Sequence, residues 1–144
     1  MTVFFDFYNT EEYGPYEVPA EATADATKMV VRRGIVDFSK QSVANAQVAN
    51  AIRIYAGEIV HNVVTRVITA EGVANSECDI GFGGGGEVAD QFAITTVNSF
   101  NANVTLVPAY FAAANAVTLM PNNGTTPNSG KVEVMAIITK SLFA

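Results

Sequence analysis

Residues 52–81 have the sequence IRIYAGEIVHNVVTRVITAEGVANSECDIG, and this stretch decides the fold of the chain. Val, Ile and Thr crowd it, and glycine occurs only where its segments meet. β-Branched side chains are restricted at their first torsion and pack well on a pleated surface. We therefore predict two strands joined at Ala56-Gly57, followed by a turn and a third strand over Glu77–Phe82.

The two strands that meet at this turn differ in pattern. In the first, Ile52 and Ile54 point to one face, whereas Arg53 and Tyr55 point to the other. The second, over Ile59–Thr69, has apolar residues on both faces: Val60, Val64 and Ile68 on one, and Ile59, Val63 and Val67 on the other. Either a bulge shifts the phase of this strand midway, or another subunit covers its second face.

Short apolar runs between turn residues predict five further strands: Met29–Phe38, Phe92–Val97, Asn103–Val107, Ala116–Met120 and Lys131–Thr139. Gly34 inside the first indicates a bulge or a close approach of another backbone. Ser39–Asn50 is predicted as a loop that could hold one helical turn. Pro121–Gly130 (PNNGTTPNSG) is a second loop, and we predict that the strands on either side of it form an antiparallel hairpin.

These elements indicate an all-β fold. About eight short antiparallel strands with turn signals between them are typical of a β-sandwich or jelly-roll-like domain. We place a single domain of this class at residues 28–144. The chain of 144 residues is long enough to bury a core without disulfides or metals.

Residues 1–27 differ from the rest of the chain. They hold six acids and no base, whereas the remaining residues hold eight of each. Proline and glycine interrupt any regular element, yet the aromatic content argues against simple disorder. We therefore predict an extended, acidic, aromatic N-terminal arm. It carries six candidate partner-contact residues: Phe4, Phe5, Phe7, Tyr8, Tyr13 and Tyr16.

Two alternatives exist for this arm. Phe4, Phe5 and Phe7 could form an edge strand of their own domain. The arm could instead pack on a neighbouring subunit, with the aromatic side chains as anchors, since Tyr and Phe provide large contact areas for little loss of entropy.

Charge and cysteine content exclude several classes of function. The net charge of −6 makes direct contact with nucleic acid unfavourable, because such binding needs clustered Lys and Arg. Cys78 is the only cysteine, so no intramolecular disulfide is possible, and a small buried hydrophobe is its expected role. We expect neither a secretory signal nor a membrane span, because the apolar residues are spread in short runs.

The chain offers few groups for chemistry. His61 is the only histidine, so no second imidazole can complete a metal site. The run Gly83–Gly86 is followed by acids, not by Lys-Ser or Lys-Thr, which favours a flexible loop over a phosphate cradle. The flanking acids could in principle gather Ca²⁺, but their spacing matches no EF-hand: Glu77, Asp79, Glu87 and Asp90. We expect no cofactor and no metal.

Catalysis is not expected either. No Gly-x-Ser-x-Gly elbow accompanies the single histidine, so an activated nucleophile is missing. A carbohydrate-binding module remains an alternative, and it would display an exposed cleft with Tyr55 or Tyr110. The absence of Trp weakens this alternative without removing it, because Tyr can also stack on sugars.

Several runs together resemble small structural proteins of tailed bacteriophages. They cover most of residues 48–139: Ile52-x-Ile54-x-Ala56-Gly57, Val60, Val64-x-x-Val67-x-Thr69-Ala70-x-Gly72, Asp79-Ile80-Gly81, Val117-x-Leu119 and Gly130-Lys131-Val132-x-Val134-x-Ala136. The chain departs from this pattern where Tyr55 precedes the Ala-Gly turn in place of a common Pro, and where the Gly run replaces an acidic loop. The arm lies outside the resemblance.

The resemblance implies a head decoration, or cement, protein: a β-sandwich that forms a homotrimer and binds the major capsid protein. It would be made in the host cytoplasm and lie on the capsid exterior of the virion, in contact with neither nucleic acid nor membrane. Another virion component, in the tail, neck or fibre base, is the alternative. A protein of either kind needs no active site.

Overall fold

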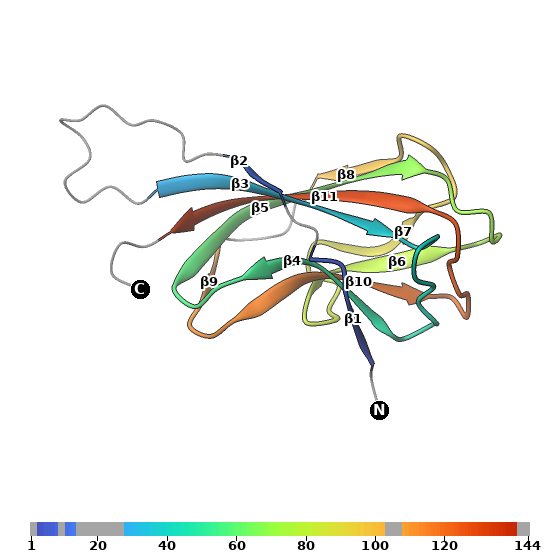
Figure 1. The fold of residues 1–144 in the computed structure, drawn as a ribbon, viewed down its shortest axis with the longest axis horizontal. Coiled ribbons are helices and arrows are strands. Elements are labelled where there is room, and N and C mark those ends of the chain that lie inside the picture. The colour runs from blue at the N-terminus through green and yellow to red at the C-terminus, as the bar shows by residue number, and fades with distance from the viewer. Residues whose placement is uncertain (1–2, 9–10, 14–27, 103–107, 141–144) are drawn as a thin grey trace.

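The computed structural model describes residues 3–8, 11–13, 28–102 and 108–140, which form eleven β-strands in two sheets. No helix in this part of the chain is long and apolar enough to cross a membrane. The two sheets form the two layers of a sandwich (Figure 1). The predicted all-β sandwich class is confirmed, although the strands are more numerous than predicted.

Sheet A has the strand order β1 (Phe4–Asp6), β4 (Val48–Ile54), β10 (Asn115–Asn122), β6 (Glu77–Phe82) and β7 (Ala89–Ala93). Sheet B has the order β2 (Glu11–Tyr13), β3 (Lys28–Asp37), β11 (Lys131–Lys140), β5 (Glu58–Thr69) and β8 (Phe100–Ala102), and β9 (Ala109–Phe111) also pairs with β5. All pairs are antiparallel except that of β1 and β4, which is parallel.

The core lies between the inner faces of the two sheets. Both sheets contribute fully buried aliphatic side chains to it: Ile52, Ile54, Ile80 and Leu119 from sheet A, and Val36, Val60, Val134 and Ile138 from sheet B. The described part of the chain therefore buries its apolar residues without a disulfide, and Cys78 is one of the core residues, as expected.

Gly34 marks a close approach of the two layers. It pairs with Val134 in an unshifted register, so it is not a bulge. A Cβ atom at this position would collide with the carbonyl oxygen of Ala51 in the opposite sheet. Of the two alternatives that the sequence left open, close backbone approach is the one observed.

A bulge explains the irregular pattern of β5. The register against β11 shifts between Val60 and Asn62, which leaves His61 as the additional residue. The core-facing set therefore passes from Val60 to Val63 and Val67, all of them fully buried. The outer face of the strand carries the half-buried residues Ile59, Val64 and Ile68.

The predicted hairpin around Pro121–Gly130 is wrong. β10 belongs to sheet A and β11 to sheet B, so this loop crosses from one layer to the other. The crossing is held by Glu71, whose carboxylate accepts hydrogen bonds from the backbone N–H groups of residues 128–130. Turn dipeptides reverse the chain, but they do not decide whether the two strands pair.

Two other predicted elements differ in position. The strand predicted at Phe92–Val97 is β7, which ends at Ala93. The loop predicted at Ser39–Asn50 begins with one tight turn, in which the N–H groups of Lys40 and Gln41 both donate to the carbonyl of Asp37, and it gives way to β4 at Val48. The strand predicted at Asn103–Val107 lies outside the described residues.

The first residues of the arm are part of the domain. Phe4–Asp6 pairs with β4, which is the edge-strand alternative, and Glu11–Tyr13 pairs with β3. Phe5 and Phe7 pack against the core, and the rings of Phe7 and Phe38 lie 6.5 Å apart. The predicted boundary at residue 27 lies outside the described residues.

We predict that Gly34→Ala destabilises the protein by about 1–3 kcal/mol, because the added methyl group forces the two layers apart. Chemical unfolding monitored by circular dichroism measures the change. Gly86→Ala is the matched control, since the nearest atoms to its Cβ would be 3.7 Å away. Equal stability of the two variants would contradict the close approach.

We predict that Glu71→Gln lowers the free energy of unfolding at pH 7 by about 1.5–3 kcal/mol. Burial alone would raise the pKa of Glu71, but the donors of residues 128–130 outweigh it and hold the pKa below the ordinary value of 4.5. The stabilisation is therefore present above about pH 4.5 and is lost as the pH falls through the folded-state pKa. Unfolding curves from pH 3 to pH 7 should converge for the two proteins at low pH; a constant gap would refute this role.

Candidate functional site

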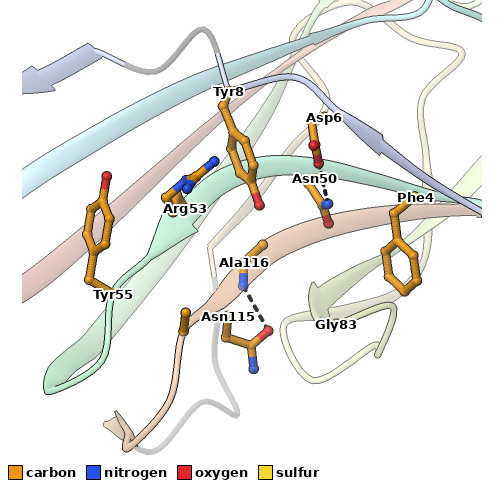
Figure 2. A pocket seen from close by; sticks show the side chains of 10 residues that line it. Phe4, Asp6, Tyr8, Asn50, Arg53, Tyr55, Gly83, Asn115 and Ala116 are labelled. Atoms are coloured by element: carbon orange, nitrogen blue, oxygen red, sulfur yellow. Dashed lines mark hydrogen bonds between the residues drawn. The ribbon is translucent and has the colours of Figure 1, made fainter.

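A groove of about 410 Å³ lies on the outer face of sheet A (Figure 2). Strands β1, β4 and β10 and the glycine loop after β6 contribute to it. Its lining consists of Phe4, Asp6, Tyr8, Asn50, Arg53, Tyr55, Gly83, Ala114, Asn115 and Ala116. We call this site the sheet-A groove. Its volume falls within the range of roughly 300–1,000 Å³ that is typical of small-ligand sites.

The alternation at the end of β4 places Arg53 and Tyr55 in the groove, beside Asn50 from the same strand. Ile52 and Ile54 are fully buried, so Arg53 and Tyr55 point outward, as the sequence predicted. Tyr55 is 53% exposed. The apolar pattern of one strand therefore determines which polar side chains reach this surface.

Tyr8 and Arg53 form a stacked pair at the centre of the groove. The guanidinium carbon of Arg53 lies 4.4 Å from the centroid of the Tyr8 ring, within the range of a cation–π contact. Burial raises the pKa of Tyr8 above its ordinary value, the charge of Asp6 adds to this rise, and Arg53 opposes it. The Tyr8 hydroxyl is therefore protonated near neutral pH, and the stacking restrains the guanidinium.

A second polar pair lies beside the first. Asn50 donates a hydrogen bond of 2.7 Å to a carboxylate oxygen of Asp6, which joins β4 to β1. Phe4, two residues before Asp6, is 53% exposed at the end of the groove. Figure 2 shows Arg53 and Asp6 on opposite sides of the Tyr8 ring.

A buried ion pair supports the groove from below. Arg32 in β3 and Glu58 in β5 form two hydrogen bonds of 2.8 and 2.6 Å, and their side chains are only 3% and 5% exposed. Glu58 also accepts the backbone N–H of Tyr55 at 2.6 Å, and Arg32 donates to the carbonyl of Arg53 at 2.8 Å. The guanidinium of Arg32 lies 5.3 Å from the Tyr55 ring centroid. The ion pair thus binds the backbone at Arg53 and at Tyr55.

The glycine loop beside the groove encloses an anion of its own. The carboxylate of Glu87 accepts the backbone N–H of Phe82 at 3.0 Å. A Cβ atom at Gly81 or Gly85 would collide with this carboxylate, so the glycines leave the room that it occupies. The loop therefore already surrounds a carboxylate of this chain.

The other acids predicted as calcium candidates are divided between different contacts. Asp79 accepts hydrogen bonds from Asn122 at 2.5 Å and from the backbone of Gln91 at 3.0 Å. A hydrogen bond with Asp79, and then its charge, raise the pKa of Asp90. Across the residues that the structure describes, no three His, Cys, Asp or Glu side chains gather in a way that could hold a metal ion.

The remaining candidate groups lie apart from the groove. His61 forms a hydrogen bond with the hydroxyl of Thr139 on the outer face of sheet B. Cys78 is buried in the core, and burial raises the pKa of its thiol. Neither contacts a residue that lines the groove.

The six arm aromatics have different surroundings. Phe4 and Tyr8 line the groove, whereas Phe5 and Phe7 pack on the core of their own domain. Tyr13 ends β2, where its backbone pairs with Val31. Tyr16 lies outside the described residues. That these six residues contact a partner stays a prediction.

Sequence reasoning missed half of the groove. It identified Phe4 and Tyr8 as partner-contact candidates and Tyr55 as a candidate for a carbohydrate cleft, but it assigned no binding role to Asp6, Asn50 or Asn115. The outward direction of Arg53 was available from the alternation of β4. Its contact with Tyr8 was not, because this contact depends on the parallel pairing of β1 with β4.

The geometry defines a β-sandwich with a mixed aromatic and polar groove on one outer face. Three structures of bacteriophage capsids contain chains with this fold. A chain in the capsid of Ralstonia phage GP4 superposes with a TM-score of 0.62 at 8% identity, over 96% of this chain and 99% of that one. A chain in the capsid asymmetric unit of cyanophage Pam1 gives a TM-score of 0.58 at 18% identity, over 88% and 94% of the two chains.

The third similar chain is in the acidic stable capsid structure of Helicobacter pylori bacteriophage KHP30. Its TM-score is 0.52 at 11% identity, and the match covers 90% of this chain and 92% of that one. At these identities the likeness is one of fold. No known protein family and no curated protein sequence matches the chain.

We predict that Arg32→Met destabilises the protein by about 3–5 kcal/mol, because it leaves the carboxylate of Glu58 buried without its partner. The measurement is chemical unfolding at neutral pH. The double variant Arg32→Met/Glu58→Met should recover most of the loss, since both charges are then absent. A single variant as stable as the unmodified protein would show that the pair does not hold this end of the sandwich.

Proposed function

We propose that this protein is a structural component of a bacteriophage virion, where it decorates the outer surface of the head shell and stabilises it as an oligomer. The observation that carries this proposal is the shared fold over almost the full length of chains from three phage capsids. The match covers 88–96% of this chain and 92–99% of those chains, so the shared fold is not confined to one segment.

The outer face of sheet B supports an adhesive role. It carries apolar side chains from its three central strands, which we call the sheet-B face: Met29, Val31, Ile35, Ile59, Val64, Ile68, Met135 and Ile137. Met29 is 42% exposed and the other seven are half-buried. Apolar side chains left partly exposed on one face are typical of interaction sites in soluble proteins. At its edge, Phe100 and Tyr110 are 62% and 64% exposed, and each pairs with an outward-facing residue of β5.

A charge network lies within this apolar face. Glu133, which is 7% exposed, accepts a bond of 2.5 Å from Arg33 and an ion-pair contact of 3.4 Å from Arg66. The single carboxylate lies between two guanidinium groups, and the Arg66 side chain is 49% exposed. Arginine among apolar residues is typical of interface hot spots, where it fixes the register of a partner.

We assign two contacts to this protein: the major capsid protein, and further copies of itself as a homotrimer. A protein that binds the assembled shell, but not its separated subunits, stabilises the shell by mass action. Such a role needs no catalysis, and the acidic net charge suits a position outside the shell, away from the nucleic acid.

Another virion component, in the tail, neck or fibre base, is the alternative within the same class. The number of copies per particle distinguishes the two. A head decoration protein is present in hundreds of copies, whereas a tail or neck component is present in dozens or fewer. Quantitative mass spectrometry of purified virions, with antibody labelling of intact particles, measures both number and location.

We predict that Phe100→Glu weakens binding to phage heads by about tenfold or more, because it places a charge at the edge of the sheet-B face. Heads that lack this protein are mixed with each variant and sedimented, and the bound fraction is measured. Phe100 is exposed, so circular dichroism should show an unchanged fold.

The matched control is Tyr55→Ala, which removes an exposed aromatic side chain from the opposite sheet and should leave the bound fraction unchanged. Full binding by the Phe100→Glu variant would refute the assignment of this face. Virions with label only on the tail would refute the decoration role itself.

A further inference from the structure

We propose that the sheet-A groove binds a neutral carbohydrate, a function beyond attachment to the shell. The groove lies on the opposite sheet from the sheet-B face, and the two share no residue. The argument follows from the aromatic surfaces, the polar groups, the charge balance and the backbone pairing of the groove.

Aromatic side chains provide the apolar part of the site. Phe4 and Tyr55, each 53% exposed, lie towards opposite ends of the groove, and Tyr8 lies between them (Figure 2). A sugar ring presents a face of C–H groups that packs against such rings. The Tyr ring also carries a hydroxyl group at its solvent-exposed end, which suits a ligand that is apolar on its faces and polar at its edges.

The polar groups supply both donors and acceptors. Arg53 can only donate, Asp6 can only accept, and the amides of Asn50 and Asn115 do both. Sugar hydroxyls also donate and accept, so a row of them can be satisfied by this set. A small number of convergent polar groups between apolar surfaces is the usual composition of a small-ligand site.

The charges of the lining cancel. Asp6 and Arg53 are its only charged side chains, and they have opposite sign. Single-stranded nucleic acid, which also stacks on aromatic rings, needs a positively charged groove. The adjacent glycine loop already encloses the carboxylate of Glu87, so it offers no site for a second anion. A neutral ligand therefore fits better than a nucleotide or an acidic glycan.

The floor of the groove disfavours a peptide strand. β4 pairs with β1 and β10, and β10 pairs with β4 and β6, so the backbone groups of both floor strands are used within the sheet. Addition of a strand needs a free backbone edge, which among the strands that line the groove only β1 has, at the rim and not at the floor. Recognition at this floor must instead occur through side chains, as it does for a saccharide.

The groove is also preorganised. Tyr8 stacks on the guanidinium of Arg53, and Asn50 donates a hydrogen bond to Asp6. Glu58 of the buried ion pair accepts the backbone N–H of Tyr55. Side chains that are ordered before binding lose less entropy when a ligand arrives. This matters for carbohydrates, whose individual contacts are weak.

The test uses the full chain on an array of neutral hexose and hexosamine oligosaccharides, with sialylated and sulfated glycans on the same surface. The strongest neutral glycan is then titrated by calorimetry. We expect Tyr55→Ala and Phe4→Ala each to weaken its binding by about tenfold or more. Tyr110→Ala, which removes a tyrosine that is 64% exposed and lies outside the groove, should leave this binding unchanged.

Phe4 lies on an exposed edge strand, so its variant tests the groove even where Tyr55→Ala affects stability. The proposal is overturned if no neutral glycan binds, if only acidic glycans bind, or if binding survives both substitutions. Loss of head binding by Tyr55→Ala without any glycan binding would identify a shell segment as the occupant instead. Retention of glycan binding by Phe100→Glu would separate the two functions.

Discussion

The structure depends on the buried ion pair between Arg32 and Glu58 at the turn where the chain passes from β4 of sheet A to β5 of sheet B. A charge in a protein interior is expensive unless it is paired and hydrogen-bonded, and this pair meets both conditions with two mutual bonds. Both residues of the pair also bind the backbone of this crossing segment. Arg32 donates to the carbonyl of Arg53, and Glu58 accepts the N–H of Tyr55. The same interaction therefore closes one end of the sandwich and determines the geometry of the groove.

Local pattern predicted most of the strands. The alternation of Ile52 and Ile54 and the limits of Glu77–Phe82 follow from the side-chain period of a strand. For Gly34 the sequence left a bulge and a close backbone approach as alternatives. The sequence pattern did not predict which sheet the chain enters after the loop Pro121–Gly130. That crossing depends on Glu71, a residue distant in sequence whose carboxylate binds the loop, and no local signal encodes such a contact.

The groove was only partly predictable for the same reason. Alternation places Arg53 and Tyr55 on the outer face, and the aromatic content of the arm made Phe4 and Tyr8 candidate contact residues. The division of the arm was not predictable. Phe5 and Phe7 pack inward while Phe4 and Tyr8 face the groove, because β1 runs parallel to β4 and alternates like any strand. Only the pairing of β1 with β4 distinguishes the aromatic residues that pack in the core from those that line the groove.

The two outer faces of the sandwich have different chemistry, and this difference connects the two proposed functions. Sheet B presents aliphatic side chains around a charge network, a composition that suits protein partners. Sheet A presents aromatic rings with balanced polar groups, a composition that suits a small polar ligand. Because the faces are on opposite layers, attachment to a shell through sheet B directs the groove of sheet A away from the particle. A rigid domain with both faces can thus hold the shell on one side and present a binding site to the medium on the other.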